Sequence, residues 1–249
     1  MNDAVSATPE RAAFLHTNRQ DTWWWVPLAT AVGLLAFIGY STWAALQGEY
    51  YEYGPYLSPF YSPLIFLDWW PFSPALLILW APGGFRLTCY YYRKAYYRAL
   101  FMTPAACSVR GRPQNYRGEQ GLLRFQNLHR YFLYLALIFV VILGYDAVKA
   151  FFFDDGFGIG IGSLVLTINA LLLAGFTFGC NSLRHLVGGN CNGFSCVPLG
   201  KQRYDAWKFV TRFNERHMEW AWASLFWVGF TDLYVRLAAM GIITDVRLI

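Results

Sequence analysis

The stretch GFGIGIGSLVLTINALLLAGFTFGCNSL, residues 156–183, contains no charged side chain and decides the fold class. A helix needs about 20 predominantly apolar residues to cross the hydrocarbon core of a bilayer, and this stretch exceeds that length. We therefore predict a membrane-spanning helix over residues 157–186. The chain is accordingly expected to be an integral membrane protein.

The overall composition supports this interpretation. Hydrophobic residues make up 56% of the 249 residues and charged residues only 14%, against roughly 25% charged residues in soluble domains. The first 21 residues lack the pattern of a cleavable signal peptide, so we interpret them as a polar tail. The net charge of +5 comes from bases that lie between the apolar spans. This distribution indicates a basic membrane face rather than nucleic-acid binding.

Five helices are predicted in one transmembrane domain, residues 1–249, so that the fold class is an all-α integral membrane bundle. The first helix opens with three successive tryptophans, as expected at a headgroup interface. In the last helix Asp232 and Arg236 are four residues apart and can pair on one helix face. The expected helix ranges are 23–46, 72–98, 127–148, 157–186 and 205–240.

Basic residues gather in two of the four connecting loops. The loops between the second and third helices and between the fourth and fifth hold most of the lysine and arginine, whereas the other two loops are acidic, with Lys149 as their only base. Cytoplasmic loops of membrane proteins carry an excess of lysine and arginine. We therefore expect the N-terminus inside and the C-terminus outside.

Five histidine and cysteine residues fall at the inner ends of the predicted helices. Polar groups at membrane depth are costly and tend to face a bundle interior or a cofactor. Three interpretations stay open at this point: helix-end anchors and packing residues, a haem b held by two histidines, or an iron–sulfur cluster, in which two histidines replace two cysteines in the Rieske type. The five residues are Cys89, His129, Cys180, His185 and His217.

Helix geometry limits how Cys180 and His185 could share a metal. Five residues apart, they are separated by about 7.5 Å along an ideal helix and about 140° around it, so they would not aim at one ion. They could serve opposite irons of a two-iron cluster if the glycines at 188 and 189 let the helix end unwind. Cys107, Cys191 and Cys196 are interpreted as loop thiols, because their spacing matches no zinc motif.

Other classes of protein find little support in the sequence. No phosphate-binding glycine loop, GxSxG or HExxH motif is present, which argues against soluble-enzyme chemistry. A transporter would need ionisable residues near the membrane midplane, and apart from Arg86 the predicted helices lack them. A structural anchor without a cofactor stays open.

Four segments resemble the cytochrome b-type membrane-anchor subunit of bacterial succinate dehydrogenases, enzymes also called succinate:quinone oxidoreductase or complex II. These segments are GFRLTCYYYRKAYYR (84–98), FQNLHRYF (125–132), FGCNSLRHLVGG (178–189) and NERHMEWAW (214–222). The resemblance covers nearly the whole chain. It implies a multi-pass protein of the bacterial cytoplasmic membrane.

The resemblance also implies a redox centre, although with altered ligands. Many anchors of this family hold two haems b with four histidines on four helices. This chain has no histidine on its first helix or in the outer helix halves, and Cys89 stands where the family places an inner-haem histidine. The resemblance therefore implies a Rieske-type [2Fe-2S] cluster, with haem b as the alternative. The implied ligands are Cys89, His129, Cys180 and His185, with His217 in reserve.

The function implied is electron transfer without succinate chemistry in this chain. A flavoprotein subunit and an iron–sulfur subunit are the expected partners, in the tricarboxylic acid cycle and respiratory chain. Electrons from succinate oxidation would reach menaquinone or ubiquinone, and no catalytic residue for succinate is expected here. Oligomeric state stays open, including a higher oligomer. The expected quinone-binding residues are Arg86, Tyr90, Tyr91, His217 and Trp220.

Overall fold

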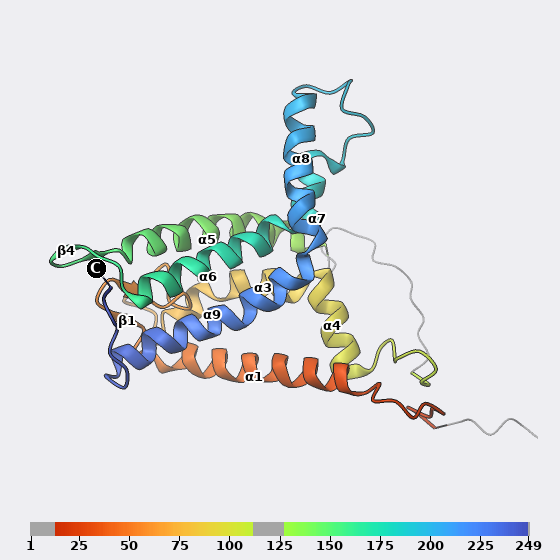
Figure 1. The fold of residues 1–249 in the computed structure, drawn as a ribbon, viewed down its shortest axis with the longest axis horizontal. Coiled ribbons are helices and arrows are strands. Elements are labelled where there is room, and N and C mark those ends of the chain that lie inside the picture. The colour runs from red at the N-terminus through yellow and green to blue at the C-terminus, as the bar shows by residue number, and fades with distance from the viewer. Residues whose placement is uncertain (1–12, 112–126, 249) are drawn as a thin grey trace, which may run out of the picture. The chain divides into compact units, whose positions relative to one another are not determined.

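The computed structural model describes residues 13–111 and 127–248 (Figure 1). Of the residues that the structure describes, 61% are helical and 5% are in strands, which confirms a mostly helical fold. It divides into two compact units. Among the described residues, the first unit combines 13–35 with 93–111, and the second unit combines 36–92 with 127–248.

Three helices are long and apolar enough to cross a membrane: α1 (Trp25–Gln47), α5 (His129–Lys149) and α6 (Ile161–Phe178). The bounds of α1 and α5 lie close to the predicted ranges 23–46 and 127–148, whereas α6 is shorter than the predicted 157–186, because the helical backbone breaks at Cys180. Large apolar side chains on these helices are exposed, for example Val141 at 72% and Leu171 at 64%. Exposed apolar faces on such helices are expected where lipid, rather than water, surrounds the protein.

The other predicted helices are interrupted in the structure. Residues 72–98 contain α2 (Ala75–Ile78), α3 (Trp80–Thr88) and most of α4 (Tyr90–Phe101). The range 205–240 is divided between α8 (Gly200–Glu215) and α9 (His217–Ala239), with a break at Arg216. After α6 the chain continues through α7 (Asn181–Arg184) into a π-helical turn, η1 (His185–Gly189).

Helices α3, α5, α6 and α9 form the core of the second unit. In Figure 1 they run side by side; α5 packs against both α3 and α6, and α9 packs along α6. Helix α8 stands across their ends and packs on α7 and η1. We call this end of the second unit the cysteine end, because Cys89 and Cys180 lie there.

The opposite end, which we call the hairpin end, carries two short antiparallel hairpins. They pair β1 (Glu52–Tyr53) with β2 (Tyr56–Leu57) and β3 (Phe152–Phe153) with β4 (Gly156–Phe157). The segment after β2 is anchored by Tyr61, whose fully buried hydroxyl donates to the carbonyl of Ala44 at 2.8 Å. The predicted loop between the first two helices is thus a folded element.

A buried ion pair joins the helices to this loop. Asp232 and Arg236 are 0% and 1% exposed, and the carboxylate lies 3.4 Å from Nε of Arg236. This contact confirms the pairing predicted from their spacing. Tyr40 donates to the same carboxylate at 2.6 Å and Ser58 donates to its other oxygen, while Arg236 also donates to the Glu49 carbonyl at 2.8 Å. Both charges are therefore neutralised and hydrogen-bonded within the protein.

In the first unit the N-terminal segment pairs with the chain after α4. The Leu15 amide donates to the Arg110 carbonyl at 2.9 Å, and the Arg110 amide donates to the His16 carbonyl at 3.0 Å. Arg19 donates to the carbonyl of Cys107 at 2.9 Å and pairs with Asp21. The first described residues are therefore tied to the segment before residue 111.

Candidate functional site

Two buried cysteines occupy matching positions in the fold. Cys89 separates α3 from α4, and Cys180 lies between α6 and α7. Both have extended backbone, with φ −62° and ψ 130° at Cys89 and φ −67° and ψ 131° at Cys180. Each cysteine therefore lies at a break in the helical backbone, directly before the helix that follows it.

Two histidines face these thiols from other helices. His129 is the first residue of α5 and His217 is the first residue of α9. Nε2 of His129 lies 3.1 Å from Sγ of Cys180, and Nε2 of His217 lies 3.6 Å from Sγ of Cys89. We call these four residues the cysteine–histidine cluster.

The cluster consists of two pairs rather than one coordination shell. Within residues 13–111 and 127–248, no three histidine, cysteine or acidic side chains are placed to hold a single metal ion. Two thiols and two imidazoles from separate segments are nevertheless soft and borderline donors, which suit iron–sulfur centres. What the arrangement offers is one thiol and one imidazole in each of two pairs.

Aromatic rings hold both imidazoles in place. Phe85 stacks on His129 with ring centroids 4.6 Å apart, and Phe176 stacks on His217 at 5.1 Å. The two phenylalanines also contact each other edge to face at 5.4 Å. These contacts fix the ring planes and separate the cluster from the neighbouring space by one layer of aromatic side chains.

Arg86 lies next to this aromatic layer. Its guanidinium sits 4.7 Å from the centre of the Phe176 ring, and Nη2 donates to the hydroxyl of Ser224 at 2.9 Å. Nη1 donates to the hydroxyl of Tyr92, which in turn donates to the Ala221 carbonyl at 2.6 Å. The described partners of Arg86 are neutral oxygens and ring faces, so its charge is hydrogen-bonded but not balanced by a carboxylate.

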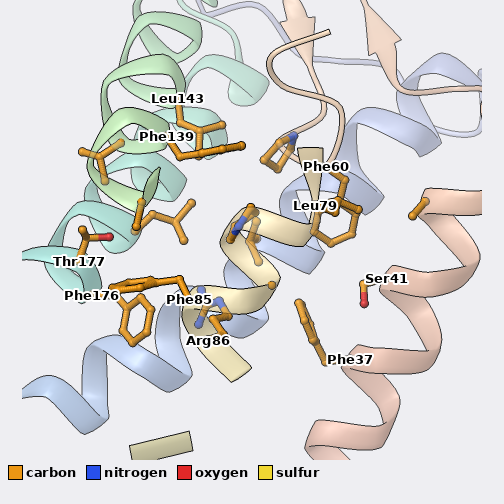
Figure 2. A pocket seen from close by; sticks show the side chains of 18 of the residues that line it. Phe37, Ser41, Phe60, Leu79, Phe85, Arg86, Phe139, Leu143, Phe176 and Thr177 are labelled. Atoms are coloured by element: carbon orange, nitrogen blue, oxygen red, sulfur yellow. The ribbon is translucent and has the colours of Figure 1, made fainter. Parts of the chain in front are cut away.

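A cavity of about 340 Å³ adjoins the cluster (Figure 2). Phe85, Arg86 and Phe176 gather at one side of it, and α1 and α5 contribute the facing walls. Among the described residues that line the cavity, Arg86 is the only charged one. Leu46 and Leu76 line it and are also exposed, so the cavity reaches the apolar surface between α1 and α2.

The structure separates the residues singled out in the sequence. Cys89, His129, Cys180 and the reserve residue His217 come together, whereas His185 begins the π-helical turn η1 with an exposed side chain. Of the five expected quinone-binding residues, only Arg86 lines the cavity. Tyr90 is 66% exposed, and Tyr91 accepts a hydrogen bond from Trp222 at 2.6 Å. Cys107, Cys191 and Cys196 are not among the residues of this site.

Trp220 has a packing contact that the sequence did not reveal. A Cβ atom added at Gly175 would lie 2.6 Å from its indole ring, so the close approach of α6 and α9 requires glycine there. His217 is similarly close to Gly179, where an added Cβ would lie 3.1 Å from Nδ1. Gly175 in α6 and Gly179 directly after α6 therefore let α9 approach closely enough for His217 to reach Cys89.

Sequence reasoning also missed Thr88 and the two phenylalanines. Thr88 precedes Cys89 directly, and Phe85 is one helical turn before it. Phe176 precedes Cys180 by four residues. The signal that could have found them is the recurrence of a phenylalanine four residues before each cysteine. The recurrence becomes interpretable only when it is known that the helical backbone breaks directly after α3 and after α6.

Comparison with known proteins identifies the family. The family model described as actinobacterial succinate dehydrogenase subunit SdhC matches residues 25–241. A solved chain from the Mycobacterium smegmatis Sdh1 complex in the apo form is 41% identical, with a TM-score of 0.83 over 97% of this chain and 98% of that one. No curated protein matches. The chain therefore belongs to the actinobacterial SdhC family of succinate dehydrogenase membrane subunits, as the resemblance to membrane anchors predicted.

Proposed function

We propose that this SdhC chain holds a Rieske-type [2Fe-2S] cluster on Cys89, His129, Cys180 and His217, and that it passes electrons from succinate oxidation to a quinone. The observation that carries the proposal is the convergence of two thiol–imidazole pairs, at 3.1 and 3.6 Å, from four separate segments. His217 takes the place that sequence reasoning assigned to His185 in the ligand set, because the side chain of His185 is exposed.

The donor set fits such a centre. A Rieske cluster uses two cysteines and two histidines, which is the set that converges here. Nδ1 of His217 is buried and makes no hydrogen bond to any described residue. When bound, the cluster would supply one-electron transfer.

The cavity is the proposed site for the quinone. Its walls are mostly apolar, as expected for a ligand that partitions into the bilayer. Its opening between α1 and α2 would face the lipid. Arg86 is the charged group that can orient a quinone oxygen and stabilise negative charge that develops on it. Phe85 and Phe176 lie between this space and the cysteine–histidine cluster, so the electron path between them is short.

The remaining parts of the proposal concern the membrane and the partners. We propose five membrane crossings, with the cysteine end and the N-terminus on the cytoplasmic side, as the distribution of lysine and arginine indicates. The basic cytoplasmic loops would dock the iron–sulfur subunit, and a flavoprotein subunit would oxidise succinate. The acceptor would be menaquinone or ubiquinone in the bacterial cytoplasmic membrane.

Spectroscopy of the purified complex tests the cofactor assignment. We expect non-haem iron and acid-labile sulfide beyond the content of the soluble subunits. We also expect a paramagnetic signal, after reduction, that shows coupling to histidine nitrogen and is lost in Cys89→Ser. Sharp reduced haem bands in place of that signal would instead identify a haem b on the histidines. Finding neither cofactor would leave SdhC as a structural anchor.

A further inference from the structure

We propose that Thr88 is a positioning residue that fixes the tautomer of His129, so that Nε2 of this histidine is the atom that binds metal. The inference rests on the proposed cluster and adds an assignment within it. It concerns a side chain that touches neither a quinone nor a metal. Its effect would pass entirely through the His129 ring.

The hydrogen bonds of Thr88 determine which atom is the donor in each. The side chain is 2% exposed, and its hydroxyl oxygen lies 2.7 Å from the carbonyl oxygen of Gly84 and 3.1 Å from Nδ1 of His129. A carbonyl oxygen can only accept, so the single hydroxyl proton is donated to Gly84. The hydroxyl oxygen can then only accept from His129. Nδ1 of His129 therefore carries a hydrogen.

This arrangement leaves the other nitrogen of His129 free to bind metal. A neutral imidazole has one N–H and one lone pair, so a hydrogen on Nδ1 places the lone pair on Nε2. Nε2 is the atom that faces Sγ of Cys180 at 3.1 Å. Metal-binding histidines commonly donate their second N–H to an oxygen, which fixes the ring orientation and the tautomer. Thr88 provides that oxygen.

His217 offers a comparison within the same site. Both imidazoles stack on a phenylalanine, so both ring planes are held. Nδ1 of His217, however, makes no hydrogen bond to a described residue, whereas Nδ1 of His129 bonds Thr88. The hydrogen bond to Thr88 is therefore specific to the His129 ring, and the contrast assigns the tautomer control to the His129 side of the cluster.

The experiment replaces Thr88 in the whole complex and measures the cluster directly. Thr88→Val keeps the shape but removes the acceptor, and Thr88→Ser keeps the acceptor. Thr231→Val is the matched control, because Thr231 is fully buried and donates to the carbonyl four residues earlier at 2.8 Å without contacting a histidine. Each variant is assayed for iron release to a chelator and for the midpoint potential of the histidine-coupled signal at fixed pH.

We expect Thr88→Val to lose iron about 10- to 100-fold faster, in line with the loss of a partner to a metal-bound histidine, and to shift the midpoint potential. Thr88→Ser and Thr231→Val should stay close to wild type. Iron retention and potential in Thr88→Val that equal those of wild type would overturn the inference. Absence of the signal from the wild-type complex would instead refute the proposed cluster.

A measurement on the wild-type complex tests the inference even if the Thr88→Val complex fails to assemble. Histidine labelled with ¹⁵N at either ring position is incorporated, and the nitrogen couplings of the reduced cluster are compared. The inference requires strong coupling from an Nε2 atom. Strong coupling carried only by Nδ1 atoms would overturn it.

Discussion

The two ends of the second unit both bury polar side chains, but they satisfy them differently. At the hairpin end the Asp232 carboxylate receives hydrogen bonds from Tyr40, Ser58 and Arg236. The charges of Asp232 and Arg236 are opposite and adjacent, so the protein alone neutralises them. At the cysteine end, thiols and imidazoles face one another, and nothing in the described chain gives them a comparable set of partners.

This difference separates a structural polar cluster from a functional one. A buried ion pair that is fully hydrogen-bonded has no further capacity to bind a ligand, and removing one partner mainly costs stability. Thiols and imidazoles that lie close together and make few hydrogen bonds keep lone pairs that can bind a metal. The following substitutions test the contrast, beginning with the largest expected effect.

At the cysteine end, the double substitution His129→Ala and His217→Ala should lower quinone reduction by at least about 100-fold, because both proposed nitrogen ligands are lost. Succinate oxidation with an artificial acceptor should survive, since the proposed function assigns that chemistry to the flavoprotein subunit. Both activities are measured on the purified complex. His185→Ala serves as the control and should behave as wild type. If His185→Ala instead matches the double variant, the ligand set predicted from the sequence is the correct one.

At the hairpin end, Arg236→Met should destabilise the protein by about 3–5 kcal/mol, because it leaves the carboxylate of Asp232 buried without its cation. Replacing both residues, as Asp232→Leu with Arg236→Met, should recover much of that loss. Thermal unfolding of the complex in detergent measures the effect, and the cofactor signal should persist. Equal losses in the single and double variants would show that the pair does not act as a unit.

Between the two ends, the close approach of α6 and α9 predicts an intermediate effect. Gly175→Ala should cost about 1–3 kcal/mol, because the added methyl group would lie 2.6 Å from the Trp220 ring. Gly229→Ala is the matched control, since its added methyl would meet Phe37 at an ordinary 3.7 Å. Unfolding temperature and quinone activity are recorded together. Equal stability of the two variants would contradict the packing of these helices.

The smallest effect concerns an exposed ion pair at the hairpin end. Arg247 donates to Asp155 at 2.7 Å, and this hydrogen bond lowers the pKa of the Asp155 carboxyl. Because the folded pKa is lowered, the contribution is present above the ordinary aspartate range and is lost as the pH falls through the lowered value. We expect slightly faster exchange of the Leu248 amide, which donates to Ile159 at 2.7 Å, in acid.

The control for this last effect is Asp155→Asn, which removes the titrating group. Its Leu248 exchange, after correction for the intrinsic rate, should no longer depend on pH over the acid range. An unchanged pH dependence in this variant would show that another group controls the end of the chain.

Much of the fold follows from the length and charge of apolar stretches. Two predicted spans agree closely with α1 and α5 and a third contains α6, because an uncharged stretch of this length has few alternatives in a membrane protein. The breaks were harder to place. Pro82 does not interrupt its helix, since it lies in the first turn of α3, where the missing N–H is tolerated. The chain breaks instead at Cys89, a residue with no strong local preference.

The candidate site shows the same limit. The depth of each residue along its helix indicated which histidines and cysteines share an end, and that grouping holds for four of them. The choice between His185 and His217 depended on the π-helical turn η1 and on the break at Arg216, neither of which a helical repeat reveals. The cavity depends on side chains from several helices and could not be inferred from any one segment.

The position of Asp232 and Arg236 on the same helix also bears on how the protein is made. A charged side chain in a bilayer is costly, and two opposite charges on separate helices could neutralise each other only after both helices had entered the bilayer. Because these residues are one turn apart on α9, their pair can form as soon as that helix coils, before α1 and the loop that carries Ser58 close around it. If α9 crosses the membrane as proposed, it can therefore enter the bilayer with its two charges already paired.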